Sequence, residues 1–285
     1  MRKLRCPTDS VQEGFGACIS SYRSEERKER LAQATPILVQ AEQDFQEKAE
    51  KRMIYQIPTH VSVGGIVTGE EMTDIYKSKF AHQKGPGRKY YDAYLLAAPQ
   101  NICPLCSVRP VSTLDHYLPK SRYPTFAVTP INLVPSCMDC NLGSKKSALP
   151  DRLETAPLHP YFDDVEQSRW LTVKLELVYT DLVPSYFASK PDVWDNGLFS
   201  RVQYHLSLYR LPTLYGTHAA EEISNCRFKW ARMYRKCGQA GLAESLAEDC
   251  RSREQVHLNS WQSAPYRALS KHVDLVCAWL DTAVP

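Results

Sequence analysis

The hydrophobic and polar positions along the chain predict helices in its first and last thirds. Residues 21–51 are rich in charge and contain no glycine, which predicts a helix interrupted near Pro36, because an interior proline removes a backbone hydrogen bond. Residues 88–98 predict a shorter helix that ends before Pro99. From residue 198 to residue 280 apolar residues recur at spacings of three and four, so this region is also predicted to be helical.

Between the helical regions the pattern changes. Residues 61–65 and 84–87 are glycine-containing segments that predict turns or loops. Residues 170–179 alternate apolar with polar residues, which predicts a strand with four apolar side chains on one face: Leu171, Val173, Leu175 and Leu177. We expect this strand to be half of a hairpin closed around residues 181–184.

Length and composition limit the possible classes of protein without selecting one. A chain of 285 residues is long enough for one large domain or two ordinary ones, and its 43% hydrophobic content supports a packed core. The net charge of +3 permits nucleic-acid binding but does not argue for it alone. The start, MRKLRCPTDS, lacks the apolar segment of a secretion signal, and no apolar run reaches membrane-spanning length. We therefore expect a cytoplasmic protein with no membrane contact.

Four of the ten cysteines are arranged as two C-x-x-C pairs, Cys103 with Cys106 and Cys137 with Cys140. A two-residue spacer lets one tight turn present two thiolates to the same tetrahedral zinc ion. Two such pairs in a chain without a secretion signal indicate a structural zinc site instead of disulfides. The remaining cysteines show no ligand spacing and are expected to be buried free thiols: Cys6, Cys18, Cys226, Cys237, Cys250 and Cys277.

The segment between and after these pairs predicts a small ββα unit. Thr113–Leu114 and Ala127–Val128 are expected to form two short strands. Pro135 and Ser136 then predict a helix start, with Ser136 as the N-cap and Pro150 as the latest possible end. On such a helix one face would present four side chains: Cys137, Cys140, Asn141 and Lys145. A unit this small has little core of its own, so a structural metal is physically sensible.

The stretch from Cys103 to Ser147 resembles the HNH, or ββα-metal, nuclease family of the kind that carries two C-x-x-C pairs. The matching residues are Asp115-His116, Asn132 and Asn141. The family often has histidine where this chain has Asn141, which still offers an oxygen ligand. The resemblance implies an α+β protein whose zinc-stapled ββα-metal core, at 99–165, lies between a mainly helical N-terminal region, 1–98, and a C-terminal strand pair and helical region, 166–285.

The resemblance also implies a mechanism. Asp115 and Asn141 would supply oxygen ligands to one catalytic Mg²⁺ or Mn²⁺ ion. His116 would act as the general base on a water molecule. Asn132 is expected to hold the loop or the His116 ring by hydrogen bonding. A phosphate contact is expected from Lys145 or Lys146. Lys120 and Arg122 are expected to bind the nucleic-acid backbone, although a solvated loop explains these two residues equally well.

The predicted function is hydrolysis of phosphodiester bonds in DNA or RNA, including tRNA. The chain also loosely resembles HNH proteins of bacterial anti-phage systems that work with an ABC-type ATPase, which implies a defence role and a partner protein. The alternative is a non-catalytic, zinc-dependent module that binds nucleic acid or protein. His159, after the predicted core, is either close to the active site or part of a turn that packs Tyr161 and Phe162.

Overall fold

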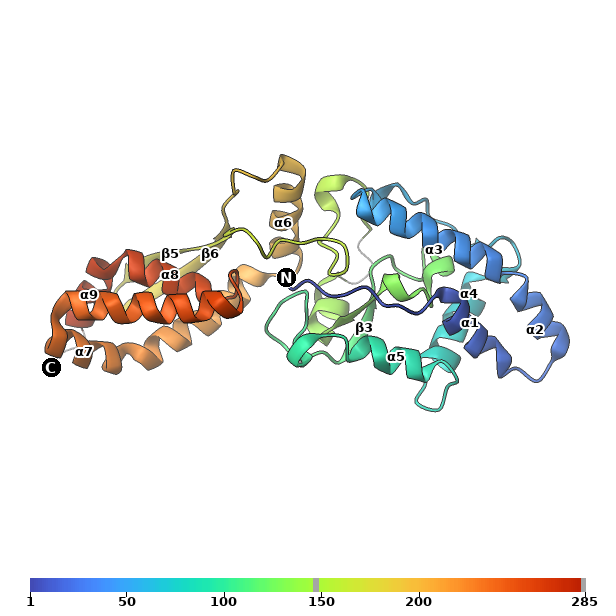
Figure 1. Cartoon of the computed structure of the whole chain (residues 1–285), viewed down its shortest axis with the longest axis horizontal. Coiled ribbons are helices and arrows are strands. Elements are labelled where there is room, and N and C mark those ends of the chain that lie inside the picture. The colour runs from blue at the N-terminus through green and yellow to red at the C-terminus, as the bar shows by residue number, and fades with distance from the viewer. Residues whose placement is uncertain (146–148, 283–285) are drawn as a thin grey trace. The chain divides into compact units, whose positions relative to one another are not determined.

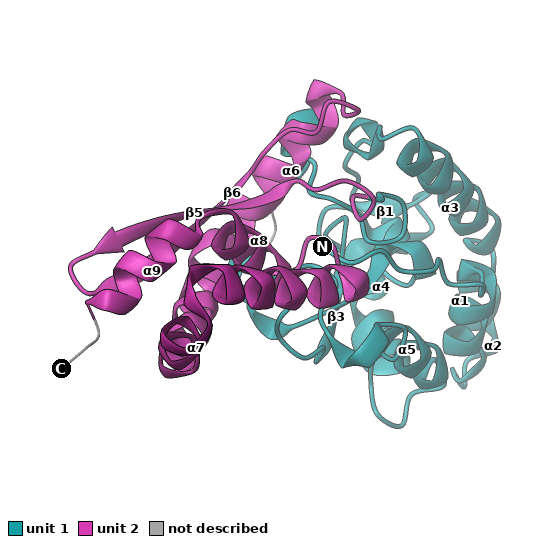
Figure 2. Ribbon diagram, turned by 60° about the vertical axis from the view of Figure 1, so that its left-hand side comes forward, with its two compact units in different colours: residues 1–164 teal, residues 165–285 magenta. Residues whose placement is uncertain are grey.

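The computed structural model describes residues 1–145 and 149–282. The chain forms two compact units, Met1–Asp164 and Val165–Pro285, drawn in different colours in Figure 2. Both units combine helices with two-stranded antiparallel sheets, so the predicted α+β class is confirmed at this level. Among the described residues, no helix is both long enough and apolar enough to cross a membrane.

Two helices of the first unit begin at reciprocal capping boxes. Ser10 and Glu13 form a reciprocal capping box at the start of α1, and Thr68 and Glu71 form another at the start of α4. The predicted break in the first helical region is confirmed, because Pro36 lies in the first turn of a new helix, where it loses no bond. The helices are α1 (Val11–Ser20), α2 (Glu25–Ala32), α3 (Thr35–Glu50), α4 (Gly69–Ile75) and α5 (Arg88–Leu95).

A short hairpin precedes α4. Its strands β1 (Ser62–Val63) and β2 (Val67–Thr68) are joined through Gly64 and Gly65, whose φ angles of 56° and 73° favour glycine. A wide helical turn, Tyr76–Phe80, follows α4, and in it the Ala81 amide donates to the carbonyl of Tyr76 at 2.8 Å. Such five-residue turns are rare and occur often at functional sites.

The central hairpin of the first unit differs from the prediction in its second strand. Strand β3 (Thr113–His116) pairs with β4 (Leu133–Ser136), whereas Ala127 and Val128 lie in a buried connection between short helical turns. Ser136 is therefore not an N-cap, since it pairs with Thr113 in the ladder. The misassignment came from Pro135, which signals a helix start but is tolerated in a strand of a two-stranded sheet.

A wide helical turn, Asp139–Lys145, follows β4. The predicted helix after the second cysteine pair therefore begins later than expected and adopts the wider form over these residues. Helix α5 packs against β3 and β4. Leu114, Val128 and Leu133 belong to the same buried cluster as Phe15 and Phe80. The N-terminal helices and the central hairpin thus share one hydrophobic core, which is why the segments 1–98 and 99–164 form a single unit.

Over its described residues, 165–282, the second unit consists of a hairpin and four helices. The predicted strand is confirmed as β5 (Leu171–Val178), which pairs with β6 (Asp181–Ala188), so the turn lies at Tyr179–Thr180, just before the expected position. Helix α7 contacts β6, α8 and α9, and these elements are shown in Figure 1. Gly238 interrupts α7 with a φ of 70°. The helices are α6 (Asn196–Leu208), α7 (Leu211–Val256), α8 (Ser263–Lys271) and α9 (Val273–Asp281).

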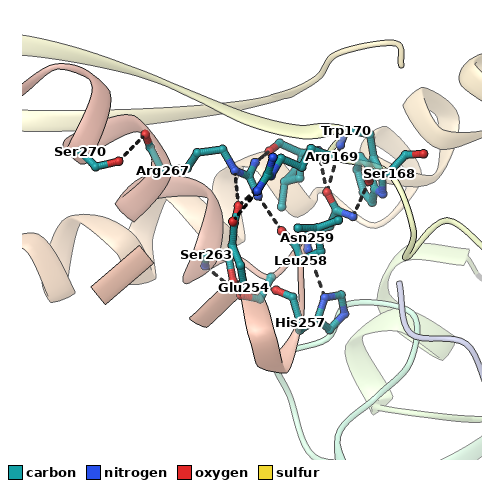
Figure 3. A network of polar contacts seen from close by, with 12 residues as sticks. Ser168, Arg169, Trp170, Glu254, His257, Leu258, Asn259, Ser263, Arg267 and Ser270 are labelled. Atoms are coloured by element: carbon teal, nitrogen blue, oxygen red, sulfur yellow. Dashed lines mark hydrogen bonds and ion pairs between the residues drawn. The ribbon is translucent and has the colours of Figure 1, made fainter. Parts of the chain in front are cut away.

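A buried polar network fixes the hairpin of the second unit to its helices (Figure 3). The side-chain oxygen of Asn259 accepts hydrogen bonds from the backbone N–H groups of Trp170 and Leu171, at 3.0 and 3.2 Å. Its amide nitrogen donates to the carbonyls of Val165 and Ser168, at 3.3 and 2.8 Å. One side chain therefore satisfies four backbone groups at the start of β5.

Candidate active site and metal centre

The four paired cysteines converge on one point. The sulfur atoms of Cys103, Cys106, Cys137 and Cys140 all lie within 4.8 Å of one another, and all four residues are buried. Four sulfurs around a tetrahedral zinc ion at about 2.3 Å lie about 3.8 Å apart, and the Sγ atoms of Cys106 and Cys137 are separated by 3.9 Å. The cluster therefore fits a zinc ion, and the predicted ligand set is confirmed as a group that could hold one.

Local backbone bonds shape the first half of this cluster. The Cys103 amide donates to the carbonyl of Arg109, and the Ser107 amide donates to the carbonyl of Cys103, each at 2.8 Å. Ser107 adopts a φ of 57°, the left-handed conformation that closes the tight turn. The second pair follows β4 directly, so the cluster ties the chain around residue 105 to the end of the central hairpin.

Asp115 lies near the end of β3 and is almost completely buried. Lys145, which is also buried, donates to Oδ2 of Asp115 at 2.7 Å and to the carbonyl of His116 at 2.6 Å. Burial raises the pKa of Asp115 and lowers that of Lys145, and each partner opposes the shift of the other. Lys145 thus neutralises the carboxylate, whereas the sequence predicted it to face a phosphate.

His116 follows Asp115, and its ring contacts the loop between the two central strands. Its Nε2 lies 2.9 Å from the carbonyl oxygen of Ala127, which can only accept, so Nε2 carries the proton and Nδ1 is the basic nitrogen. Burial, together with the ammonium groups of Lys120 and Lys145, lowers the pKa of His116 to about 3. The ring is therefore neutral at pH 7, as a general base must be before it accepts a proton.

Asn132 holds the loop between the two central strands. Its side-chain oxygen accepts from the Leu118 amide at 2.7 Å, and its nitrogen donates to the carbonyls of Leu118 and Phe126, at 3.1 and 3.0 Å. The residue is fully buried. Of the two expected roles, the structure places Asn132 on the loop, and its bond to Phe126 fixes the chain next to Ala127, the partner of the His116 ring.

A cleft of about 370 Å³ opens beside these residues, and Asp115, His116, Asn141 and Lys120 all line it. The Asn141 amide nitrogen donates to the carbonyl of Leu114 at 3.3 Å, which leaves its side-chain oxygen as an acceptor. Within the described residues, Oδ1 of Asp115 likewise carries no hydrogen bond. Two oxygen donors suit a hydrated Mg²⁺ or Mn²⁺ ion, because Mg²⁺ keeps several water ligands and takes few from protein.

The remaining predicted residues have varied positions. Arg122 is exposed and outside the lining of this cleft, while Lys146 lies outside the described residues. His159 is fully buried, with its ring 4.3 Å from that of Tyr117 and 4.9 Å from that of Phe162, which agrees with a packing role. Among the other cysteines, Cys6 and Cys237 are exposed, so the expectation of burial was wrong for these two.

The chain is similar to Protein ea31 of Escherichia phage lambda. The two are 25% identical over 300 aligned residues, which cover 96% of this chain and 98% of that protein. No family model matches the chain, and no solved structure matches it. The name of the phage protein states no activity.

Sequence reasoning missed the part of the site that comes from the N-terminal region. Tyr76 packs its ring edge-on against His116, with the ring centroids 4.5 Å apart. Thr73 and Lys77, from α4 and the wide turn, line the same cleft as Asp115 and His116. The spacing of these residues carries no recognisable signal, because a shared core, and not a local motif, brings them to the central hairpin.

Proposed function

We propose that the chain is a metal-dependent endonuclease of the HNH type that hydrolyses phosphodiester bonds of nucleic acid. The observation that supports this best is the convergence of a carboxylate, a neutral imidazole and an amide oxygen, from Asp115, His116 and Asn141, on one cleft. These three residues match the family motif in order and spacing. The adjacent cysteine cluster would supply the zinc that stabilises the hairpin and the turn presenting them.

In this proposal the chain's own residues divide the chemistry among them. A divalent cation bound by Asp115 and Asn141 would neutralise charge on the reacting phosphate. Nδ1 of His116 accepts the proton of the attacking water, while its Nε2–H stays bound to the Ala127 carbonyl. Asn132 is a positioning residue, since it fixes the loop that carries Ala127. Lys120 contributes positive charge at the mouth of the cleft.

The low pKa of His116 makes it a weak base in the free protein. A phosphodiester entering the cleft adds negative charge next to the ring and raises the pKa, because an opposite charge favours the protonated imidazolium. Substrate binding would therefore strengthen the base at the moment when it is needed. The sugar of the substrate is left open, and DNA, RNA and tRNA are all proposed substrates, with phage defence and an ABC-type ATPase as the proposed setting.

One observation favours the second candidate, a non-catalytic zinc-dependent binding module. The buried Lys145 ammonium already neutralises Asp115, the carboxylate that a catalytic cation would need. In a binding module this ion pair would be a fixed structural element. In the nuclease, the cation would share the carboxylate with Lys145 through the other oxygen.

The test is cleavage of plasmid, single-stranded DNA, total RNA and tRNA by the purified chain with Mg²⁺ or Mn²⁺. His116→Gln is the decisive variant, because glutamine retains a donor for the Ala127 carbonyl but has no basic nitrogen. We expect cleavage to fall by at least about 10²-fold in this variant, the usual contribution of a general base. His82→Ala, which removes an exposed histidine, is the control. Folded, zinc-loaded protein that cuts no substrate would favour the binding module.

A further inference from the structure

The cleft beside His116 has a wall that the central hairpin and the wide turn after it do not supply. This wall is the wide turn Tyr76–Phe80, which directly follows α4. Tyr76 is buried against the His116 ring, whereas the next residue, Lys77, is exposed and lines the cleft. A single turn of the N-terminal region therefore both packs against the proposed base and offers a cation to whatever occupies the cleft.

Lys77 is not the only ammonium group on the cleft. Lys120 lines it too, and its Nζ lies over the Tyr76 ring, 5.1 Å from the centroid. Burial lowers the pKa of Lys120 and the charge of Lys77 lowers it further, while Asp115 opposes the shift. In the part of the chain that the structure describes, neither lysine forms a salt bridge. Two like charges on one cleft repel each other, and an anion bound between them offsets this repulsion.

A second, larger cleft continues from the first. Its volume is about 670 Å³, and it shares Thr73, Lys77 and Ser121 with the cleft at His116. An extended ligand that leaves His116 would therefore pass Lys77. The carboxylates of Glu70 and Asp74 also line the larger cleft and would repel an anion, so the favourable position for a phosphate is at the Lys77 end.

We propose that Lys77 and Lys120 together form a subsite for a backbone phosphate of a nucleic-acid strand, next to the phosphate that is cut. The subsite rests on the proposed nuclease function and extends it to the N-terminal region. Lys120 is held in place by the Tyr76 ring, and Lys77 projects from the wide turn. The ligand class is a polyanion with regularly spaced phosphates, because the subsite lies along a continuous path and not in a closed pocket.

The test compares Lys77→Gln with Lys79→Gln, both made in the His116→Gln background so that the strand stays intact. Lys79 lies on the same turn, but its Nζ is over the Tyr22 ring, and it lines neither of the two clefts. Binding of a labelled single strand of about 12 nucleotides is followed by fluorescence anisotropy across a salt series. Because Lys77 is exposed, its substitution is expected to leave the melting temperature unchanged.

We expect Lys77→Gln to weaken binding about three- to tenfold at low salt and to reduce the magnitude of the slope of log K against log salt by about 0.7, the value for one lost phosphate contact on a single strand. Lys79→Gln should bind like its parent. A neutral methylphosphonate, placed at one position at a time, should weaken the parent most at one site near the cut, and this loss should disappear in Lys77→Gln.

Equal affinities and slopes for the two lysine variants, with no such coupling, would overturn the subsite. That result would leave the nuclease proposal standing whenever the chain with His116 intact cuts nucleic acid. If the parent binds no nucleic acid under any condition, the proposed function itself fails and the subsite fails with it.

Discussion

Asn132 in the first unit and Asn259 in the second are both buried, and each bridges backbone segments that are distant in sequence. The bonds of Asn259 fix the backbone at and just before the start of β5. Asn259 lines neither the cleft at His116 nor the larger cleft next to it. The bonds of Asn132 fix a loop whose Ala127 carbonyl orients a histidine on a cleft. Burial of a polar side chain is thus no mark of function, and the distinction lies in which side chain the fixed backbone orients.

The same contrast holds for charged residues. Arg267 in the second unit is bound by Glu254 and by the carbonyls of Leu171 and Leu258, so its charge serves the packing of α8 on the hairpin. Within the residues that the structure describes, Asp115 in the first unit is paired on one oxygen only, and it lines a cleft with the other groups of the site.

The largest effect is expected from the cysteine cluster. Cys140→Ser should release the zinc and destabilise the first unit by more than about 5 kcal/mol, because structural zinc contributes on the order of 10 kcal/mol to folding. The loss is measured by the zinc content per chain and by limited proteolysis. We expect proteolysis to degrade the first unit and to leave fragments of the second unit intact. Cys237→Ser, at an exposed cysteine outside the cluster, is the control. Unchanged zinc content in Cys140→Ser would contradict the ligand assignment.

The next effect concerns the Asp115–Lys145 pair. Lys145→Met should lower the free energy of unfolding by about 4 kcal/mol, because it leaves a buried carboxylate without its partner. The double variant Lys145→Met with Asp115→Asn should recover part of this loss, as chemical denaturation would show.

The response to Mg²⁺ provides a second test of the Asp115–Lys145 pair. If Asp115 binds the cation, Mg²⁺ should raise the melting temperature of Lys145→Met more than that of the unchanged chain. The absence of any Mg²⁺ effect on Lys145→Met, under conditions in which the variant is folded, would count against a catalytic metal at Asp115.

The two asparagines provide the direct comparison. Asn132→Ala and Asn259→Ala should each lower the free energy of unfolding by about 3 kcal/mol, since each removes several buried hydrogen bonds at about 1 kcal/mol apiece. Only Asn132→Ala should also reduce cleavage, by at least about tenfold, when assayed well below its melting temperature. A similar loss of cleavage in Asn259→Ala would show that the second unit also positions the active site.

The smallest effect is a pH dependence in the second unit. Burial alone would raise the pKa of Glu254, but hydrogen bonds from Arg169 and Arg267 outweigh it and hold the pKa below its ordinary value. A lowered folded-state pKa contributes stability above the unfolded pKa of about 4.3, and this contribution is lost as the pH falls through the folded value. At pH 7 the free energy of unfolding of the unchanged chain should exceed that of Glu254→Gln by about 1.5 kcal/mol.

Denaturation of both proteins between pH 7 and pH 3 checks this prediction. The stability difference should be constant down to about pH 5 and should shrink below it. A difference that stays the same down to pH 3 would show that the carboxylate charge contributes nothing to the network of Figure 3.

The features that depend on local spacing could be predicted from the sequence. The C-x-x-C pairs gave the ligand cluster, the alternation from Leu171 gave β5, and the spacing of apolar residues gave the C-terminal helices. It also singled out Asp115, His116 and Asn141, which the structure brings to one cleft. Each of these signals lies within a short stretch of chain, where turn geometry or residue periodicity decides the outcome.

The features that depend on long-range packing are set by contacts between segments that lie far apart in the sequence. Pro135 and Ser136 locally favour a helix start, yet pairing with β3 makes them a strand, because the buried ladder satisfies more of their backbone than a helix end would. Lys145 pairs with Asp115 across 30 positions. Lys77 reaches the cleft because the N-terminal helices share a core with the central hairpin, and no local pattern encodes a contact made through a core.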